Sequence, residues 1–124
     1  MRLRIVIACF ALCTLPAFGQ DPVKVDAKHT KVEYENDQVR ILRFHLGPHE
    51  SSPMHSHPDR FFVFLNDGHT RVTENGKVEE RHAKRGDTGM RPASAHAVEN
   101  LADTDYETII VEFKQKQQAI SGKK

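Results

Sequence analysis

The sequence has little excess charge of either sign. Its 124 residues contain 18 Lys and Arg against 17 Asp and Glu, which gives a formal net charge of +1. Binding to nucleic acid or to an anionic membrane surface relies on clustered basic charge, so we expect neither as a partner. The chain is also too short for two compact domains, and we therefore expect a single one.

Cysteine is rare, and both cysteines lie in a segment that we expect to be removed. Residues 1–20 start with Arg2 and Arg4 and continue with an apolar run over 5–18, which is typical of a secretory signal peptide. The run is shorter than the roughly 20 residues that a helix needs to cross a bilayer. We therefore predict a secreted or periplasmic protein that has no membrane association after cleavage.

Loss of Cys9 and Cys13 with this segment leaves a mature chain without a thiol. This excludes thiolate catalysis, disulfides and metal sites with cysteine ligands. The eight histidines of the sequence remain as the candidate metal ligands.

Between residues 31 and 114, short apolar or β-branched runs alternate with turn signals. This pattern predicts an all-β fold, a small antiparallel β-barrel of jelly-roll type. The clearest strands are Val39–Leu46 and 61–65, and Asn75-Gly76 is typical of a two-residue hairpin turn. The expected organisation is a signal peptide over 1–20, an N-terminal arm over 21–30, the barrel domain over 31–114 and a flexible C-terminal tail over 115–124.

The run 61–65 lacks the polar alternation of a half-exposed strand, so both of its faces should contact apolar surface. Two explanations remain open for what packs against the outer face of this strand. The terminal strands of the barrel could lie there, or Phe62 and Phe64 could contact a second subunit in a homodimer.

His55 and His57 are separated by a single residue. On a strand this spacing places both imidazoles on one face, close enough to share one metal ion. The residues around the pair strengthen this interpretation: Gly47 precedes it, Gly68 follows it, and a second block contains Gly86, Pro92, His96 and Asn100.

These two blocks resemble the two motifs of the cupin superfamily over residues 47–100. The resemblance implies a barrel of six to eight strands and a divalent metal held by His55, His57 and His96. The sequence departs from the family pattern in the spacing from Gly47 to His55 and in the spacing from Pro92 to His96. It also has Phe61 where the usual fourth ligand, a glutamate, would stand.

A site of three neutral imidazoles leaves a divalent ion its full charge, which favours anionic, chelating oxygen donors. Imidazole suits Fe, Zn, Cu or Ni. We expect Phe61, Val63 and Leu65 to form an apolar cavity wall beside the ion. The ligand would then be a small molecule with an anionic or enolisable end.

Similar all-histidine cupins include dioxygenases, so the resemblance implies a metal-dependent dioxygenase or a related lyase or isomerase. The alternative is a non-catalytic barrel that binds a ligand or oligomerises. No catalytic residue is assigned.

Other polar residues near the motifs have competing interpretations. Asp59 is either a further ligand or a turn residue, and Arg60 and Arg91 either bind a carboxylate or are solvated. We expect Glu99 to point outward and Asn100 to bond the backbone. The remaining strand histidines are assigned to surface or hydrogen-bonded positions: His29, His45, His69 and His82.

Overall fold

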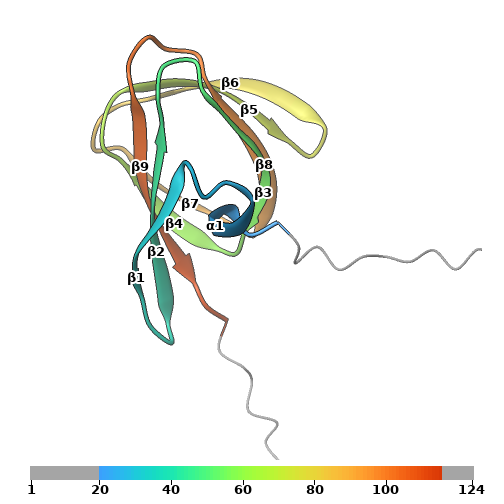
Figure 1. Ribbon diagram of the computed structural model, residues 1–124, viewed down its shortest axis with the longest axis vertical. Coiled ribbons are helices and arrows are strands. Elements are labelled where there is room, and N and C mark those ends of the chain that lie inside the picture. Colours follow the sequence, from blue (N-terminus) through green and yellow to red (C-terminus); the bar gives the residue numbers. More distant parts are fainter. Residues whose placement is uncertain (1–19, 116–124) are drawn as a thin grey trace, which may run out of the picture.

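The structure of the protein is a computed structural model that describes residues 20–115 (Figure 1). The predicted signal peptide and C-terminal tail lie outside the described residues, apart from Gln20 and Gln115. In chain order the elements are α1 (Pro22–Val25), β1 (Thr30–Glu35), β2 (Val39–Leu46), β3 (Ser51–His57), β4 (Arg60–Phe64), β5 (Gly68–Glu74), β6 (Lys77–Ala83), β7 (Thr88–Arg91), β8 (Ser94–Asn100) and β9 (Tyr106–Phe113).

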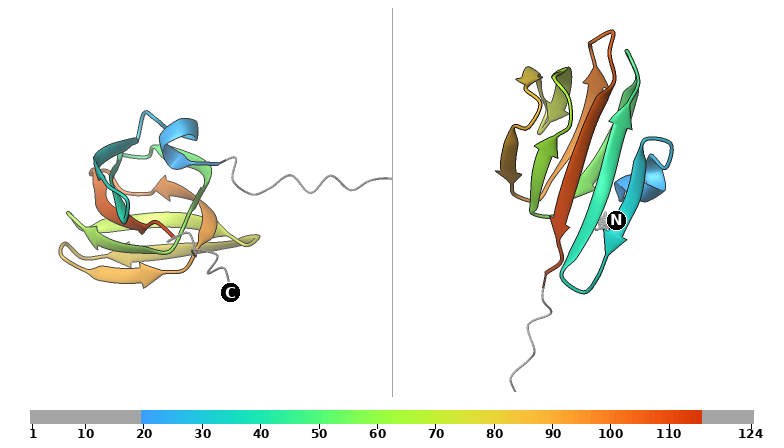
Figure 2. Two further views of the ribbon diagram at one scale, coloured as in Figure 1. Left: turned by 90° about the horizontal axis from the view of Figure 1, so that it is seen from below. Right: turned by 90° about the vertical axis from the view of Figure 1, so that its left-hand side faces the viewer.

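The strands form two antiparallel sheets that face each other (Figure 2). One has the order β1-β2-β9-β4-β7 and the other the order β3-β8-β5-β6. The predicted all-β, jelly-roll-like fold is confirmed. Over residues 20–115 no strand of one sheet pairs with a strand of the other, so the barrel is open rather than closed.

The predicted hairpin at Asn75-Gly76 joins β5 to β6. Asn75 has φ 53° and Gly76 has φ 73°, as a type I′ turn requires at both central positions. This turn matches the right-handed twist of the two strands, and it fixes their register with Glu74 opposite Lys77.

The core lies between the sheets, because alternate residues of each strand point inward. Its buried apolar side chains are Leu42, Phe44, Leu46, Val72, Val98 and Ile110. The Phe44 ring also packs on His55, with 6.1 Å between the ring centroids. The core therefore supports one side of the histidine group directly.

The residues of β4 that point inward differ from those predicted. The strand starts at Arg60, and its even-numbered residues face the interior, where Phe62 and Phe64 line the cavity between the sheets. A Cβ atom on Gly89 would lie 2.5 Å from the Phe62 ring, so this glycine in the neighbouring strand β7 makes room for the inward ring.

Two predictions for this strand are therefore wrong. Phe61, Val63 and Leu65 do not form the cavity wall, and Phe62 and Phe64 do not face a partner subunit. Every residue of the run 61–65 is apolar, so the sequence pattern does not distinguish its two faces. In the turn before β4, Asp59 Oδ1 accepts a hydrogen bond from the Ala93 amide at 2.8 Å.

The outer face of β4 carries the half-buried Phe61 and Val63. Met90 of β7 lies opposite Phe61 and is 65% exposed. The homodimer stays a prediction, and these three side chains, rather than Phe62 and Phe64, form the apolar surface available to a second subunit.

Residues 21–30, expected as an arm, contain α1 and pack against the sheet that carries β3 (Figure 1). The Asp21 side chain accepts a hydrogen bond from the Val23 amide, and Pro22 occupies the first turn, as is favourable at a helix start. Asp26, at the end of α1, is buried. Within residues 20–115, none of the helical structure has the length and apolarity of a membrane span.

Candidate metal centre

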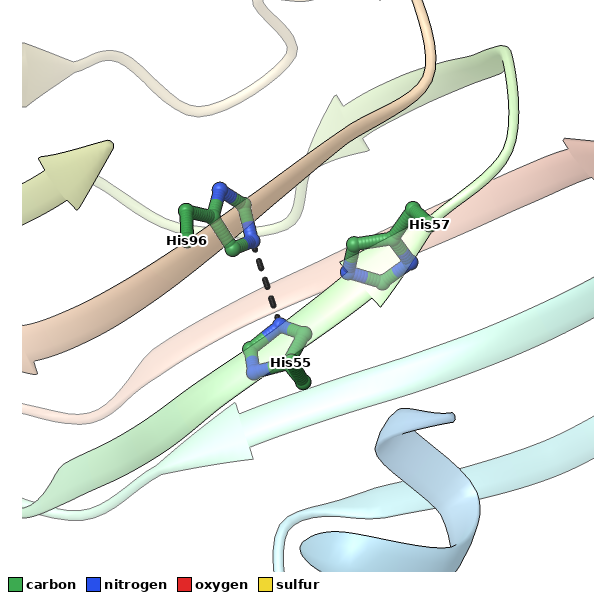
Figure 3. A group of neighbouring side chains, drawn as sticks. All are labelled: His55, His57 and His96. Carbon is green, nitrogen blue, oxygen red and sulfur yellow. Dashed lines mark hydrogen bonds between the residues drawn. The ribbon is translucent and has the colours of Figure 1, made fainter. Parts of the chain in front are cut away.

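His55, His57 and His96 lie together between the two sheets (Figure 3). The first two come from β3, and His96 comes from β8, where it is the Cα partner of His55. One ring nitrogen of each lies within 4.8 Å of the others. The structure therefore brings together the three histidines that the sequence singled out.

A β-bulge in β3 directs the side chains of His55 and His57 toward the interior. The register with β8 shifts between Ser52 and His55, so two residues, Pro53 and Met54, are exposed in succession. Ser52, His55 and His57 then all face the interior. Pro53 is tolerated there because β3 is an edge strand of its sheet.

Glu112 of β9 orients the His57 ring. Its Oε2 lies 2.6 Å from His57 Nδ1, and both side chains are buried. Because a carboxylate only accepts, Nδ1 carries the proton and the lone pair of Nε2 is free. In the described part of the chain, that Nε2 atom is buried without a hydrogen-bond partner.

Glu112 is itself held by Arg40 of β2. The Arg40 guanidinium contacts Glu112 Oε1 at 2.7 Å and Asp21 Oδ2 at 2.8 Å. A chain of charged contacts therefore runs from the start of α1 to His57. This arrangement is the carboxylate–histidine pairing that fixes the tautomer of metal-ligating imidazoles.

His55 is oriented in the same sense by different groups. Its Nδ1 donates to the Pro53 carbonyl oxygen at 2.8 Å, which leaves Nε2 as an acceptor. Ser52 Oγ lies 3.2 Å from the same Nδ1 and donates to Asp26 Oδ2. Asp26 also bonds His29 Nδ1 at 2.7 Å, so the segment after α1 supports His55 from behind.

His96 completes the group with its Nε2 atom 3.1 Å from His55 Nε2. Because His55 Nε2 has no proton, His96 Nε2 donates in this contact. The His96 Nδ1 atom and Glu74 Oε2 are 3.8 Å apart, and neither has a hydrogen-bond partner within residues 20–115. A cation on Nε2 would move the His96 proton to Nδ1, where Glu74 can accept it.

Burial keeps these three imidazoles neutral. Burial, together with the neighbouring histidines, lowers the pKa of His55 to about 4 and that of His96 to about 2. Burial also lowers the pKa of His57, although the bond to Glu112 opposes the shift. All three are thus in the protonation state that metal ligation requires.

The affinity for a divalent ion should therefore change little between pH 7.5 and pH 6.0. Three histidines with the ordinary pKa of 6.5 would lose about 50-fold in affinity over this range, because each proton competes with the metal. His55 and His96, with pKa values of about 4 and about 2, lose almost nothing over this range, and the lowered pKa of His57 reduces its own contribution to the loss. Calorimetric titration with Zn²⁺ at the two pH values measures this, and a 50-fold fall would contradict the depressed pKa values.

The histidines open into a cavity of about 760 Å³ between the sheets. Its apolar wall includes Phe62, Phe64, Val98 and Ile110. Three arginines also line it, Arg60, Arg81 and Arg91, against a single carboxylate, Asp87, among the lining residues. The cavity therefore combines an apolar surface with positive charge.

The remaining candidates have the following roles. Asp59 is a turn residue, bonded to the Ala93 amide. Asn100 Nδ2 donates to the carbonyl oxygens of Gly47 at 3.0 Å and Thr104 at 2.8 Å, as expected.

Glu99 points outward and pairs with Arg71. His45 and His69 lie on strands, and each lies beside a carboxylate. His82 stacks on His69. His29, expected on a strand, lies in the turn before β1 and bonds Asp26.

Sequence reasoning missed three residues behind the imidazoles: Asp26, Glu74 and Glu112. A signal exists for Glu112, because Thr108, Ile110 and Glu112 share the inward face of β9. A charged residue at an inward position of an apolar strand needs a buried partner. No comparable local pattern marks Asp26.

Comparisons with known proteins identify the relatives of this chain. The family model described as a cupin domain matches residues 42–112. No curated protein matches the sequence.

Among solved structures, a cupin domain from Bordetella pertussis has a TM-score of 0.66 and 23% identity, over 69% of this chain and 92% of its own. An RmlC-like cupin family protein from Methanocaldococcus jannaschii has a TM-score of 0.56 and 22% identity, over 71% and 83% of the two chains. A protein from Thermotoga maritima described as a predicted oxalate decarboxylase has a TM-score of 0.50 and 26% identity, over 64% and 70%.

Proposed function

The chain belongs to the cupin domain family, and we propose that it is a metal-dependent enzyme acting on a small molecule. It binds one divalent ion through His55, His57 and His96. The observation that carries this proposal is the buried Nε2 atom of His57, which has no hydrogen-bond partner in the described residues and faces two further imidazoles. A buried polar atom without a partner is costly unless a ligand satisfies it.

The donor set fits a first-row divalent metal. Imidazole suits Fe, Zn, Cu or Ni, and three such ligands leave coordination positions for a substrate. When bound, the ion supplies Lewis acidity at these positions, and iron additionally supplies oxygen chemistry. Because the ligands are neutral, the ion keeps its full charge and favours an anionic or enolisable substrate.

The residues of the chain then bind and shield the substrate. The cavity lies between the two sheets, and Phe62 and Phe64 line it from the sheet opposite the one that carries the histidines. The Thermotoga maritima structure, described as a predicted oxalate decarboxylase, supports a small anionic substrate. We propose a dioxygenase or a related lyase or isomerase.

The alternative is a barrel that binds a small ligand without turnover. The same cavity serves both functions, so activity decides between them. Protein purified without an affinity tag is loaded with Fe²⁺, and oxygen uptake is followed with diketones, thiols and phenolic acids. Uptake with at least one compound, absent in the His96→Ala variant, supports the enzyme. Stoichiometric metal without uptake or substrate conversion across the panel supports the binding barrel.

We also propose that the protein is exported, on the basis of the basic start and apolar run in residues 1–20. Expression of the full chain in a bacterial host, followed by N-terminal sequencing of the protein from the periplasm and medium, tests this. A new N-terminus near residue 20 supports export. A full-length chain recovered from the cytoplasm contradicts it.

A further inference from the structure

Arg60 is a buried cation in the wall of the cavity. It is the first residue of β4, is 3% exposed, and lines the same cavity as the three histidines. Its guanidinium donates to the Pro92 carbonyl oxygen at 3.2 Å and to Ser94 Oγ at 3.2 and 3.3 Å. These acceptors are neutral, and the distances are long for hydrogen bonds from a charged donor.

Arg60 has no carboxylate within 4.0 Å in the part of the chain that the structure describes. Arg40 provides the contrast, since it is also largely buried but contacts both Asp21 and Glu112. The two carboxylates that act on Arg60 from a distance are Glu74 and Glu112. Glu112 bonds His57 and Arg40, and Glu74 lies between Arg91 at 3.9 Å and His96 at 3.8 Å, so neither contacts Arg60.

A buried charge without a counter-ion is unfavourable, so it calls for an anion from outside the chain. The guanidinium has five N–H donors in a planar fork that matches a carboxylate, and the recorded contacts use three of them at most. The cavity supplies the space for such a ligand, since Arg60 lies on its wall.

The neighbouring side chains indicate what the anion is attached to. Phe62 and Phe64 follow Arg60 on the inward face of β4, and their rings form an edge-on pair with 5.2 Å between the centroids. Arg81 and Arg91 add positive charge to the lining, where Asp87 is the one carboxylate. One strand thus presents a charged group followed by two aromatic rings.

We propose that Arg60 binds the carboxylate of a small organic acid whose apolar body packs against Phe62 and Phe64. This inference rests on the proposed function in one respect, that the acid is the molecule presented to the three histidines. It names the substrate class and assigns its recognition to Arg60, which takes no part in holding the metal.

Benzoate and benzamide are suitable probes, because they share one shape and differ in charge. Calorimetric titrations are made on the metal-free full chain, so that no ion can bind the carboxylate. The wild-type protein is expected to bind benzoate at least tenfold more tightly than benzamide. Arg60→Gln is expected to lose this preference, and the matched control Arg71→Gln, an exposed arginine paired with Glu99, is expected to keep it.

Several results would overturn the proposal. Equal binding of benzoate and benzamide by the wild-type protein would overturn it. This comparison needs no variant, so it tests the proposal even if Arg60→Gln does not fold. Unchanged benzoate preference in folded Arg60→Gln would also do so. Binding of inorganic phosphate as tight as that of benzoate would exclude an apolar carboxylate as the ligand class.

A second variant separates this site from the metal centre. His96→Ala is expected to bind Zn²⁺ about 100- to 1,000-fold more weakly and to keep the benzoate preference. Arg60→Gln is expected to keep the Zn²⁺ affinity of the wild-type protein and to lose the preference. If the metal proposal fails, His96→Ala binds Zn²⁺ as tightly as the wild-type protein, and the benzoate result still depends on Arg60 alone. Loss of the preference in folded His96→Ala would contradict the assignment to Arg60.

Discussion

Replacing His96 with alanine is expected to lower the affinity for Zn²⁺ by about 100- to 1,000-fold. A four-ligand zinc site binds with roughly 10–16 kcal/mol, or about 3–4 kcal/mol for each ligand, and that is the loss expected for one imidazole. His96 is the ligand supplied by β8, so its removal leaves only the pair on β3. The remaining two imidazoles both lie on β3, and the ligand from the neighbouring strand β8 of the same sheet is missing.

The affinity is measured by competition with a chelator of known strength. His45→Ala is the matched control, because His45 is an exposed histidine on β2 whose nearest acidic contact is Asp105 at 3.5 Å. We expect its Zn²⁺ affinity to equal that of the wild-type protein. An equal loss in both variants, or no loss in His96→Ala, would show that the metal binds elsewhere.

Replacing Glu112 with glutamine is expected to lower the free energy of unfolding by about 3 kcal/mol. Removing one partner of a buried ion pair costs roughly 3–5 kcal/mol when the other charge is left uncompensated, and because Arg40 keeps Asp21 the loss is expected at the lower end of this range. Glutamine keeps the volume of Glu112 but leaves Arg40 with Asp21 alone, and it weakens the hold on the His57 ring. Urea denaturation at pH 7 measures the change.

Glu107→Gln is the control on the same strand. Glu107 also pairs with an arginine of β2, Arg43, at 2.7 Å, but its side chain is 29% exposed and that of Arg43 is 40% exposed. Such a pair contributes at most about 1 kcal/mol. The same loss of stability in both variants would show that the burial of Glu112 has no special energetic role.

Glu112→Gln should also weaken the metal site by about 10- to 100-fold, because the loss of a partner behind a ligating imidazole has effects of this size. The Zn²⁺ affinity of the folded variant, measured by chelator competition, tests this. Glu107→Gln should bind Zn²⁺ as the wild-type protein does. An unchanged affinity in Glu112→Gln would remove Glu112 from the support of His57.

The histidine group could be predicted from the sequence because its signals are periodic. The one-residue spacing of His55 and His57 has a fixed meaning on a strand, and the block around His96 has its own turn residues. The bulge before His55 was not visible, yet it preserves the pairing, because both histidines follow it.

The inner face of β4 could not be predicted in the same way. The run 61–65 is apolar at every position, so nothing in it distinguishes the two faces. The assignment of Phe61 to the cavity depended on motif spacing, whereas Phe62 lines the cavity in the structure. Arg60 lies on the same inward face, and the sequence left open whether this arginine binds a carboxylate or is solvated.

The support behind the imidazoles depends on long-range packing. Asp26 reaches Ser52 because α1 packs against β3, and residues 21–30 carry no periodic pattern that predicts this. Glu112 reaches His57 across the two sheets, since β9 and β3 belong to different ones. Such contacts follow from the topology rather than from local sequence.

X-ray absorption spectroscopy of the Zn²⁺-loaded full chain, purified without a tag, tests the central claim most directly. The predicted spectrum has three imidazole nitrogen ligands at about 2.0–2.1 Å, with the remaining coordination from water oxygen. The His96→Ala protein, loaded at high Zn²⁺, should show two. A wild-type spectrum with one imidazole or none, or with carboxylate oxygens as the main ligands, would contradict a metal centre formed by His55, His57 and His96.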